Sequence, residues 1–377
     1  MHPHLEIMSF TEQLESIAAI AATNAAEVDR GTFPSKNLEE LRAAGLLGLV
    51  SATEVGGGGK GLGEASIVVE RLARECASTA MIVCMHYCAA AVLEAHGSRE
   101  VRTAVAAGKH LSTLAFSETG SRSHFWAPIG VAKQSGGDVL LTARKSWITS
   151  AHHADSYVWS SKPLAGAEAS TLWLVPRTTA GVRLSEAQFD GIGLRGNDSV
   201  PATAEDARLP MSAMLGADGA GFGIMMGVVL PWFNVLSASV SAGLMEAATT
   251  RTAAHASGTT FQHAGSSIAD LPTVRAFIAR MRIGTDQTKA LIGDTLAAMA
   301  VNRADTMLRV LESKAAAGES AAQVTDLAMR VCGGAAFRKD VGVERIFRDA
   351  RAALVMGPTT DVLYDFIGKA VCGLPLF

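Results

Sequence analysis

The sequence is poor in cysteine, in aromatic residues and in charge, and each shortage excludes a class of protein. Only five of its 377 residues are cysteines, and none of them form a CxxC pair, so neither a disulfide framework nor a zinc ribbon is indicated. The 33 basic residues stand against 36 acidic ones without a basic block, so a nucleic-acid-binding surface has no electrostatic support. We expect a reduced, cytoplasmic protein that does not bind nucleic acid.

One long stretch lacks charge altogether. Residues 219–245 contain no Asp, Glu, Lys or Arg, and a bilayer helix needs only about 20 apolar residues. Pro231, Asn234 and three serines interrupt the stretch, however, and the N-terminal residues do not resemble a secretory signal. We therefore expect no membrane segment but a helix buried between the subunits of a homo-oligomer, either a dimer or a tetramer.

The pattern of apolar and turn-forming residues changes twice along the sequence, which predicts three domains. Residues 1–110 read as helices, the first capped by Ser9 or Thr11 and the next opened at Pro34 and ended at Gly45. Residues 111–212 contain short alternating runs (STLAFS, DVLLTA, SYVWSS, STLWLVP and GVRLS), which predict an antiparallel sheet or small barrel. Helical spacing returns over 213–377. The fold class is therefore α+β.

The residues alone point to no particular chemistry. The motifs HExxH and GxSxG and a P-loop do not occur. Adjacent His152 and His153 favour a solvated loop, and Cys84 and Cys88, one helical turn apart, favour core packing, so we expect no metal site. His86 lies in an apolar helix, where a hydrogen-bonded core histidine is the simplest interpretation.

Six segments, taken in order, carry a resemblance to one family. They are FSETGSRSHF (116–125), KSWITS (145–150), GIGLRGNDS (191–199), RLP with MLGADGAGF (208–222), RVCGGAAF (330–337) and VERIFRDAR (343–351). Their order and spacing resemble the acyl-CoA dehydrogenase superfamily over essentially the full chain. The resemblance implies an N-terminal helical domain, a central antiparallel β domain and a C-terminal four-helix bundle.

The resemblance also implies a flavin and the residues that hold it. The backbone at Phe116 and Ser117 is expected to meet the pyrimidine end of the isoalloxazine, Trp147 to pack on the ring, and the Thr149 hydroxyl to reach N5. The other residues that match the family's cofactor positions are Ser123, near the pyrophosphate, Gly333 and Gly334, which let backbone approach the dinucleotide, and Thr359 and Asp361, near the last helix.

Departures from the family pattern bear on the chemistry. A dehydrogenase needs a carboxylate to remove the α-proton while the β-hydride goes to flavin N5. The position where most of the family has this Glu is occupied by Gly357. A minority of the family has it in the central helix of the third domain, where Phe233 and Asn234 stand here. Neither glycine nor phenylalanine can take a proton.

A second departure concerns the flavin phosphates. Phe261 stands where the resemblance places an arginine that grips the pyrophosphate of a neighbouring subunit. Arg330 replaces a glutamine before the two glycines and offers a substitute charge. The cofactor is therefore expected to be FAD or FMN, without a choice between them.

These losses resemble the flavin-dependent monooxygenase branch of the family. Such an enzyme receives reduced flavin from a flavin reductase, adds oxygen to it and passes one oxygen atom to a small organic substrate. It needs a dry pocket and one or two hydrogen-bond donors rather than a base. His86 and Asn234 are the catalytic candidates for this reading, which we favour.

Two alternatives stay open. The first is a dehydrogenase of acyl-CoA or acyl-carrier-protein thioesters whose base has moved, for example to Asp361 or Asp365. The second is a flavin-binding paralogue without turnover, against which the intact Trp147 and Thr149 argue. The sequence does not identify the substrate.

Overall fold

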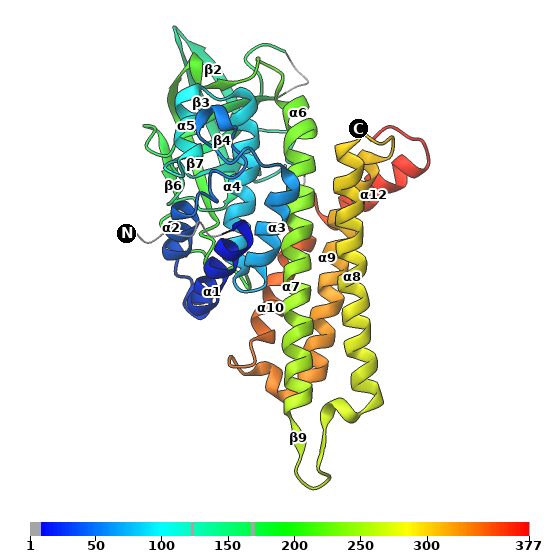
Figure 1. Cartoon of the computed structure of the whole chain (residues 1–377). Helices are drawn as coiled ribbons and strands as arrows, with labels where there is room; N and C mark the ends of the chain where they lie inside the picture. Colours follow the sequence, from blue (N-terminus) through cyan, green and yellow to red (C-terminus); the bar gives the residue numbers. More distant parts are fainter. Residues whose placement is uncertain (1–8, 122–123, 167–169, 377) are drawn as a thin grey trace, which may run out of the picture.

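Helices come first in the structure, a pair of sheets follows, and a bundle of long helices ends the chain (Figure 1). The computed structural model describes residues 9–121, 124–166 and 170–376. The order of elements confirms the predicted α+β architecture.

The N-terminal helices begin and end where local residues predict. They are α1 (Phe10–Val28), α2 (Ser35–Ala43), α3 (Leu62–Ala73), α4 (Ala77–His96) and α5 (Arg99–Ala106). Ser9 caps α1, because its hydroxyl accepts from the Glu12 N–H while the Glu12 carboxylate accepts from the Ser9 N–H. Gly45, with φ at +73°, follows the end of α2 in the left-handed conformation that glycine tolerates.

The middle region consists of two four-stranded sheets, where the sequence predicted one antiparallel sheet or barrel. One sheet has the order β1 (Ser112–Ala115), β4 (Ser156–Ser161), β5 (Thr171–Pro176), β8 (Met214–Leu215), and the other β2 (Val131–Ser135), β3 (Asp138–Ile148), β7 (Val200–Pro210), β6 (Val182–Leu184). β1 and β4 are parallel, because the chain passes through the second sheet between them. β8 lies beyond the predicted boundary at residue 212 and pairs with β5.

The C-terminal helices form the bundle on the right of Figure 1. They are α6 (Gly221–Ile224), α7 (Leu230–Gly258), α8 (Pro272–Ala300), α9 (Thr306–Cys332), α10 (Val343–Ala350), α11 (Ala352–Val355) and α12 (Thr360–Val371). A small hairpin of β9 (Thr260–Phe261) and β10 (Ser266–Ser267) joins α7 to α8 at the end of the bundle far from α6 (Figure 1).

The charge-poor helix α7 is buried by its own chain, which corrects the expectation that a second subunit covers it. It packs against α3, α4, α8, α9 and α10. Two helical stretches, Ala77–His96 and Gly221–Gly258, are long and apolar enough to cross a membrane, but 89% and 72% of their most apolar windows are buried inside the fold. Burial of this kind is what core helices show, and α7 by itself therefore argues neither for a membrane nor for an oligomer.

Candidate functional site

An exposed tryptophan stands on a bulge at the end of β3. The pairing of β3 with β7 shifts register between Lys145 and Ile148, and Trp147 adopts a left-handed φ of 58°. The bulge turns the indole outward, so that Trp147 is 69% exposed. The Phe189 ring meets the indole edge to face, at 6.4 Å between centroids. A large aromatic face held out in this way is available to a planar ligand.

The turn after β1 lies beside this bulge. The Ser146 N–H donates to the Ser117 carbonyl oxygen at 2.9 Å, which brings Phe116 and Ser117 next to the bulge. Thr149, just beyond the bulge, is buried, and its hydroxyl lies 3.2 Å from that of Ser199. The structure therefore brings together Phe116, Ser117, Trp147 and Thr149, four of the residues that the sequence predicts to hold flavin.

The remaining predicted cofactor residues lie in the C-terminal region. Arg330 stacks its guanidinium on the Phe277 ring at 4.6 Å, at the end of α9. Gly333 and Gly334 follow, and a Cβ at either position would meet no atom within 4 Å. Thr359 caps α12, and Asp361 lies exposed in its first turn. Contacts among the described residues do not join Arg330 or the glycines to Trp147, and Ser123 lies outside the described residues.

A buried lysine holds the turn that carries Gly357. Lys314 Nζ donates to the carbonyl oxygens of Ala353, Met356 and Pro358 at 3.2, 3.0 and 2.7 Å. It also lies 5.8 Å from the centroid of the Phe233 ring. Burial lowers the pKa of Lys314 to about 7. A buried amine therefore lies beside both positions, 233 and 357, at which the family resemblance implies a carboxylate.

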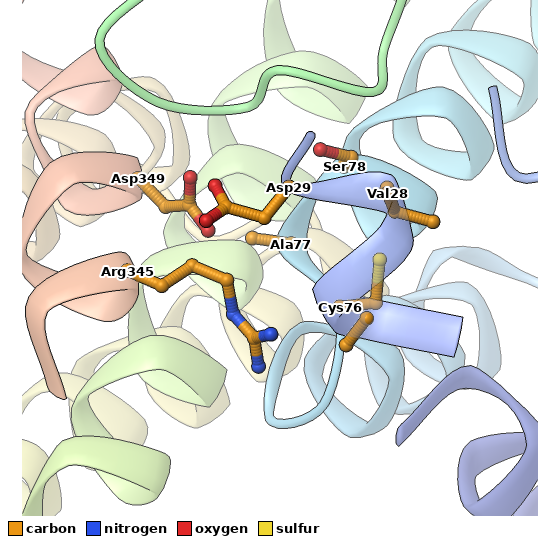
Figure 2. A pocket seen from close by; sticks show the side chains of 8 residues that line it. Val28, Asp29, Cys76, Ala77, Ser78, Arg345 and Asp349 are labelled. Carbon is orange, nitrogen blue, oxygen red and sulfur yellow. The ribbon is translucent and has the colours of Figure 1, made fainter. Parts of the chain in front are cut away.

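A junction of charged side chains lies where the N-terminal helices, the middle region and the bundle meet (Figure 2). The carboxyl groups of Asp349 and Asp29 point toward each other across a cavity of about 10 Å³, with Arg345 at its edge. Asp349 accepts from the Leu194 N–H at 2.7 Å, and Arg348 forms an ion pair with Asp29 at 2.6 Å. Burial raises the pKa of Asp349 to about 6. The cavity has room for about one water molecule, so this junction has a structural role.

Comparison with known proteins identifies the family. Family models described as the N-terminal, middle and C-terminal domains of acyl-CoA dehydrogenase match residues 9–108, 113–207 and 219–372. The chain belongs to the acyl-CoA dehydrogenase family. The human mitochondrial short-chain specific acyl-CoA dehydrogenase is 27% identical over 347 residues, which cover 90% of this chain and 83% of that protein.

Solved structures show the same fold. Butyryl-CoA dehydrogenase from Megasphaera elsdenii superposes with a TM-score of 0.88 at 20% identity, covering 97% of this chain and 100% of that one. An FAD complex of PigA superposes with a TM-score of 0.85 at 19% identity, covering 97% and 99% of the two chains. At these identities the superpositions establish the shared architecture.

Within this acyl-CoA dehydrogenase fold, both ring nitrogens of His86 are bonded to backbone, which argues against its assignment as a catalytic candidate. Its side chain is fully buried in α4. Nε2 lies 3.0 Å from the Leu47 carbonyl oxygen, and Nδ1 accepts from the Ser112 N–H at 3.2 Å. Burial lowers the pKa of His86 to about 4, so the ring is neutral. Both nitrogens bind backbone, and neither is left for a substrate or an oxygen adduct.

The side-chain amide of Asn234 forms a hydrogen bond through its nitrogen but not through its oxygen, among the described residues. The residue is fully buried in α7, and its amide nitrogen donates to the Val310 carbonyl oxygen at 3.3 Å. Its Oδ1 has no hydrogen-bond partner among the residues that the structure describes. A buried acceptor without a donor is costly. One of the two amide hydrogens is bonded to α9, so Asn234 keeps a single hydrogen for a ligand and stays a predicted catalytic donor.

The two histidines of the loop after β3 have protein partners. His152 Nδ1 lies 2.9 Å from Asp198 Oδ1, and the His153 ring stacks on Phe33 at 3.6 Å. Cys84 and Cys88 are both buried. Within the described ranges, no group of three or more His, Cys, Asp or Glu side chains is placed to hold a metal ion.

Three functional candidates escaped sequence reasoning. Glu118 and Lys145 form a buried ion pair, and both stand inside segments already singled out, FSETGSRSHF and KSWITS. Lys314 follows Val310 by four residues on the buried face of α9. A lysine at an apolar-face position of a helix was the available signal, because a buried ammonium requires dedicated acceptors.

Proposed function

We propose that the protein is an FAD-dependent oxidoreductase that removes hydrogen from the α and β carbons of an acyl thioester. The observation that carries this proposal is that an acyl-CoA dehydrogenase fold holds the exposed Trp147 next to Ser117, with Phe116 and Thr149 buried beside them in the chain. The human relative named above is a short-chain specific acyl-CoA dehydrogenase.

The residues present fit a flavin. Trp147 offers an exposed aromatic face, which a bound isoalloxazine would cover. The open backbone at Gly333 and Gly334 suits close approach by a dinucleotide, which favours FAD over FMN, and the PigA structure contains FAD. When bound, the flavin supplies a two-electron acceptor for the β-hydride. The task left to the chain is to orient the thioester, exclude water and accept the α-proton.

Asp361 is the carboxylate that we assign to proton removal. It lies in the first turn of α12, four residues after Gly357, and forms no salt bridge with another described residue. Asp365, the other candidate, is ion-paired with Lys369 at 2.8 Å. An unpaired carboxylate keeps its lone pairs for substrate, and general-base catalysis contributes about 10²–10⁴-fold.

The proposed reaction determines which redox partner and which acyl carrier the enzyme needs. Dehydrogenation leaves the flavin reduced, so the enzyme requires an electron acceptor rather than the flavin reductase that a monooxygenase needs. The acyl group is carried on coenzyme A or on an acyl carrier protein. We also propose a homo-oligomer, dimer or tetramer, now supported by exposed apolar side chains near the C-terminus, including Val355, Val371 and Leu374. A cytoplasmic location stays a prediction.

Anaerobic reduction tests the proposal. FAD-loaded protein is mixed without oxygen with a chain-length series of saturated acyl-CoA and acyl-carrier-protein thioesters, and visible flavin absorbance is followed. We expect at least one thioester to bleach the flavin. Failure of the whole series, with FAD bound, would overturn the proposed function.

A flavin monooxygenase is the second candidate, favoured by one observation. The turn 353–358 carries no carboxylate, and Phe233 stands at the other position that the resemblance allows for a base. Stopped-flow mixing of the reduced enzyme with oxygen distinguishes the two, because an oxygenase stabilises an oxygen adduct for seconds. A protein that binds FAD but shows neither behaviour would be the non-catalytic paralogue.

A further inference from the structure

A fully buried ion pair lies directly beneath the predicted flavin surface. Lys145 Nζ lies 2.6 Å from Glu118 Oε1, and the two side chains are 0% and 2% exposed. The ammonium also donates to the Ser160 carbonyl oxygen at 2.7 Å and to the Ser160 hydroxyl at 2.9 Å. The Phe116 carbonyl oxygen lies 3.4 Å from Nζ as a fourth acceptor, so the three protons of the buried ammonium have acceptors on every side.

The carboxylate end is equally well bonded. Glu118 Oε2 accepts from the N–H groups of Ile129 and Gly130 at 2.5 and 2.9 Å. A Cβ at residue 130 would lie 2.4 Å from the Ala143 Cβ, so glycine allows this close approach to β3. The pair thus ties four segments together: the turn after β1, the start of β2, the strand β3 and the strand β4.

The pair is placed to set the geometry of the flavin contacts. Lys145 precedes Trp147 by two residues, and Glu118 follows Ser117 directly. The backbones of Glu118 and Lys145 form a β-bridge, next to the hydrogen bond from Ser146 to Ser117. Trp147 has a positive φ, a conformation that persists in a non-glycine residue only where the surroundings impose it.

We infer that Lys145 and Glu118 are positioning residues for the flavin, which hold the Phe116–Ser117 backbone and the Trp147 bulge in one arrangement so that both meet the same ligand. This inference rests on the proposed function, since it presumes that the surface binds FAD. Buried ion pairs add little net stability compared with apolar replacements of similar volume. The contribution of this pair is thus to the arrangement of the site rather than to the free energy of folding.

FAD titration of three variants tests the inference. Lys145→Met removes the cation, Glu118→Leu removes the anion, and the double variant removes both without leaving a buried charge. We expect each variant to bind FAD about tenfold or more weakly, equivalent to roughly 1.4 kcal/mol. Arg144→Met is the matched control, because Arg144 is exposed on the same strand, and it should bind FAD as the natural sequence does.

The double variant separates positioning from folding. Its circular dichroism and melting temperature should stay close to those of the unchanged protein, while its FAD affinity falls. Native affinity in a folded double variant overturns the inference and leaves the proposed function intact. If the unchanged protein itself fails to bind FAD, the proposed function fails instead.

A pH profile of the unchanged protein gives a readout that needs no variant. Burial lowers the pKa of Lys145 to about 8; the charged group that faces it is Glu118, and the Trp159 ring lies 5.4 Å away. The FAD dissociation constant should therefore rise as pH passes 8 in the unchanged protein and in Arg144→Met, and not in Lys145→Met. A profile that is the same in all three overturns the inference.

Discussion

The proposed flavin surface in the middle region, formed by Phe116, Ser117, Trp147 and Thr149, and the turn at Gly357 in the bundle differ in how their residues are brought together. On the flavin surface the functional residues fall in two short segments, 116–118 and 145–149, which lie side by side through backbone pairing. At the turn, the defining contacts join Lys314 on α9 to carbonyl oxygens some 40 residues later. Local motifs therefore describe the first region well and the second poorly.

The proposed flavin surface and the turn at Gly357 also differ in their chemical groups. The proposed flavin surface carries Phe116, Ser117, Trp147 and Thr149, whereas the turn lacks a carboxylate and is held by the Lys314 side chain. A cofactor surface is needed for any flavin chemistry, while the base is needed only for proton removal. On the proposed function, the turn and the helix that follows it are therefore where dehydrogenation and oxygenation would differ.

The largest effect is expected from replacing Asp361, the carboxylate that we assign to proton removal. Asp361→Asn should slow anaerobic flavin reduction by an acyl thioester by about 10²–10⁴-fold, because the amide cannot accept the α-proton. Stopped-flow absorbance measures the rate, with Asp365→Asn as the matched control, since Asp365 is already paired with Lys369. Equal rates in Asp361→Asn and the unchanged protein would remove Asp361 as the base.

The next largest effect is expected from replacing Lys314, which holds the turn 353–358. Lys314→Met leaves three buried carbonyl oxygens without their donor, and the free energy of unfolding should fall by about 3 kcal/mol. Lys369→Met, at the exposed ion pair on α12, should cost less than about 1 kcal/mol. Urea denaturation measures both. Similar losses in the two variants would mean that Lys314 does not hold the turn.

Features of the fold that depend on residues close in sequence could be predicted, and features that depend on distant residues could not. The Ser9 cap, the Gly45 stop and five strands could be predicted, because each depends on residues close in sequence. The second sheet and the parallel pairing of β1 with β4 depend on long-range topology, which strand patterns do not encode.

Individual residues show the same limit at the site. Trp147 and Thr149 could be placed from one motif. His86 could not, because its role depends on the carbonyl of Leu47 and the N–H of Ser112, which lie 39 and 26 residues away. The helix α7 looked like a subunit interface because its sequence does not reveal that α3, α8 and α9 cover it.

A smaller effect probes the flavin surface. Trp147→Ala should weaken FAD binding by about 1–3 kcal/mol, since an aromatic partner of the ring is lost. Stability should hardly change, because the indole is 69% exposed without ligand. Fluorescence titration measures the affinity, and Ile192→Ala is the control, since Ile192 is equally exposed. Unchanged FAD affinity would show that the flavin does not lie on Trp147.

The smallest expected effect concerns the junction of Figure 2, where neither flavin nor substrate is involved. Burial raises the pKa of Asp349 to about 6, from an ordinary value near 4, so the folded state binds a proton more tightly than the unfolded state between these pH values. The contribution of Asp349 to stability is therefore complete below about pH 4 and is lost as pH rises through 6. Arg345 and Arg348 favour the charged form, Asp29 opposes it, and we expect a net change of up to about 2 kcal/mol.

Asp349→Asn isolates this contribution, because the amide oxygen can still accept from the Leu194 N–H but does not titrate. The difference in unfolding free energy between the unchanged protein and the variant should therefore fall from pH 4 to pH 7 in favour of the variant. Urea denaturation at four pH values measures it. A flat difference for Asp349→Asn would mean that water in the adjoining cavity solvates the carboxylate, and the junction would then contribute to domain packing without responding to pH.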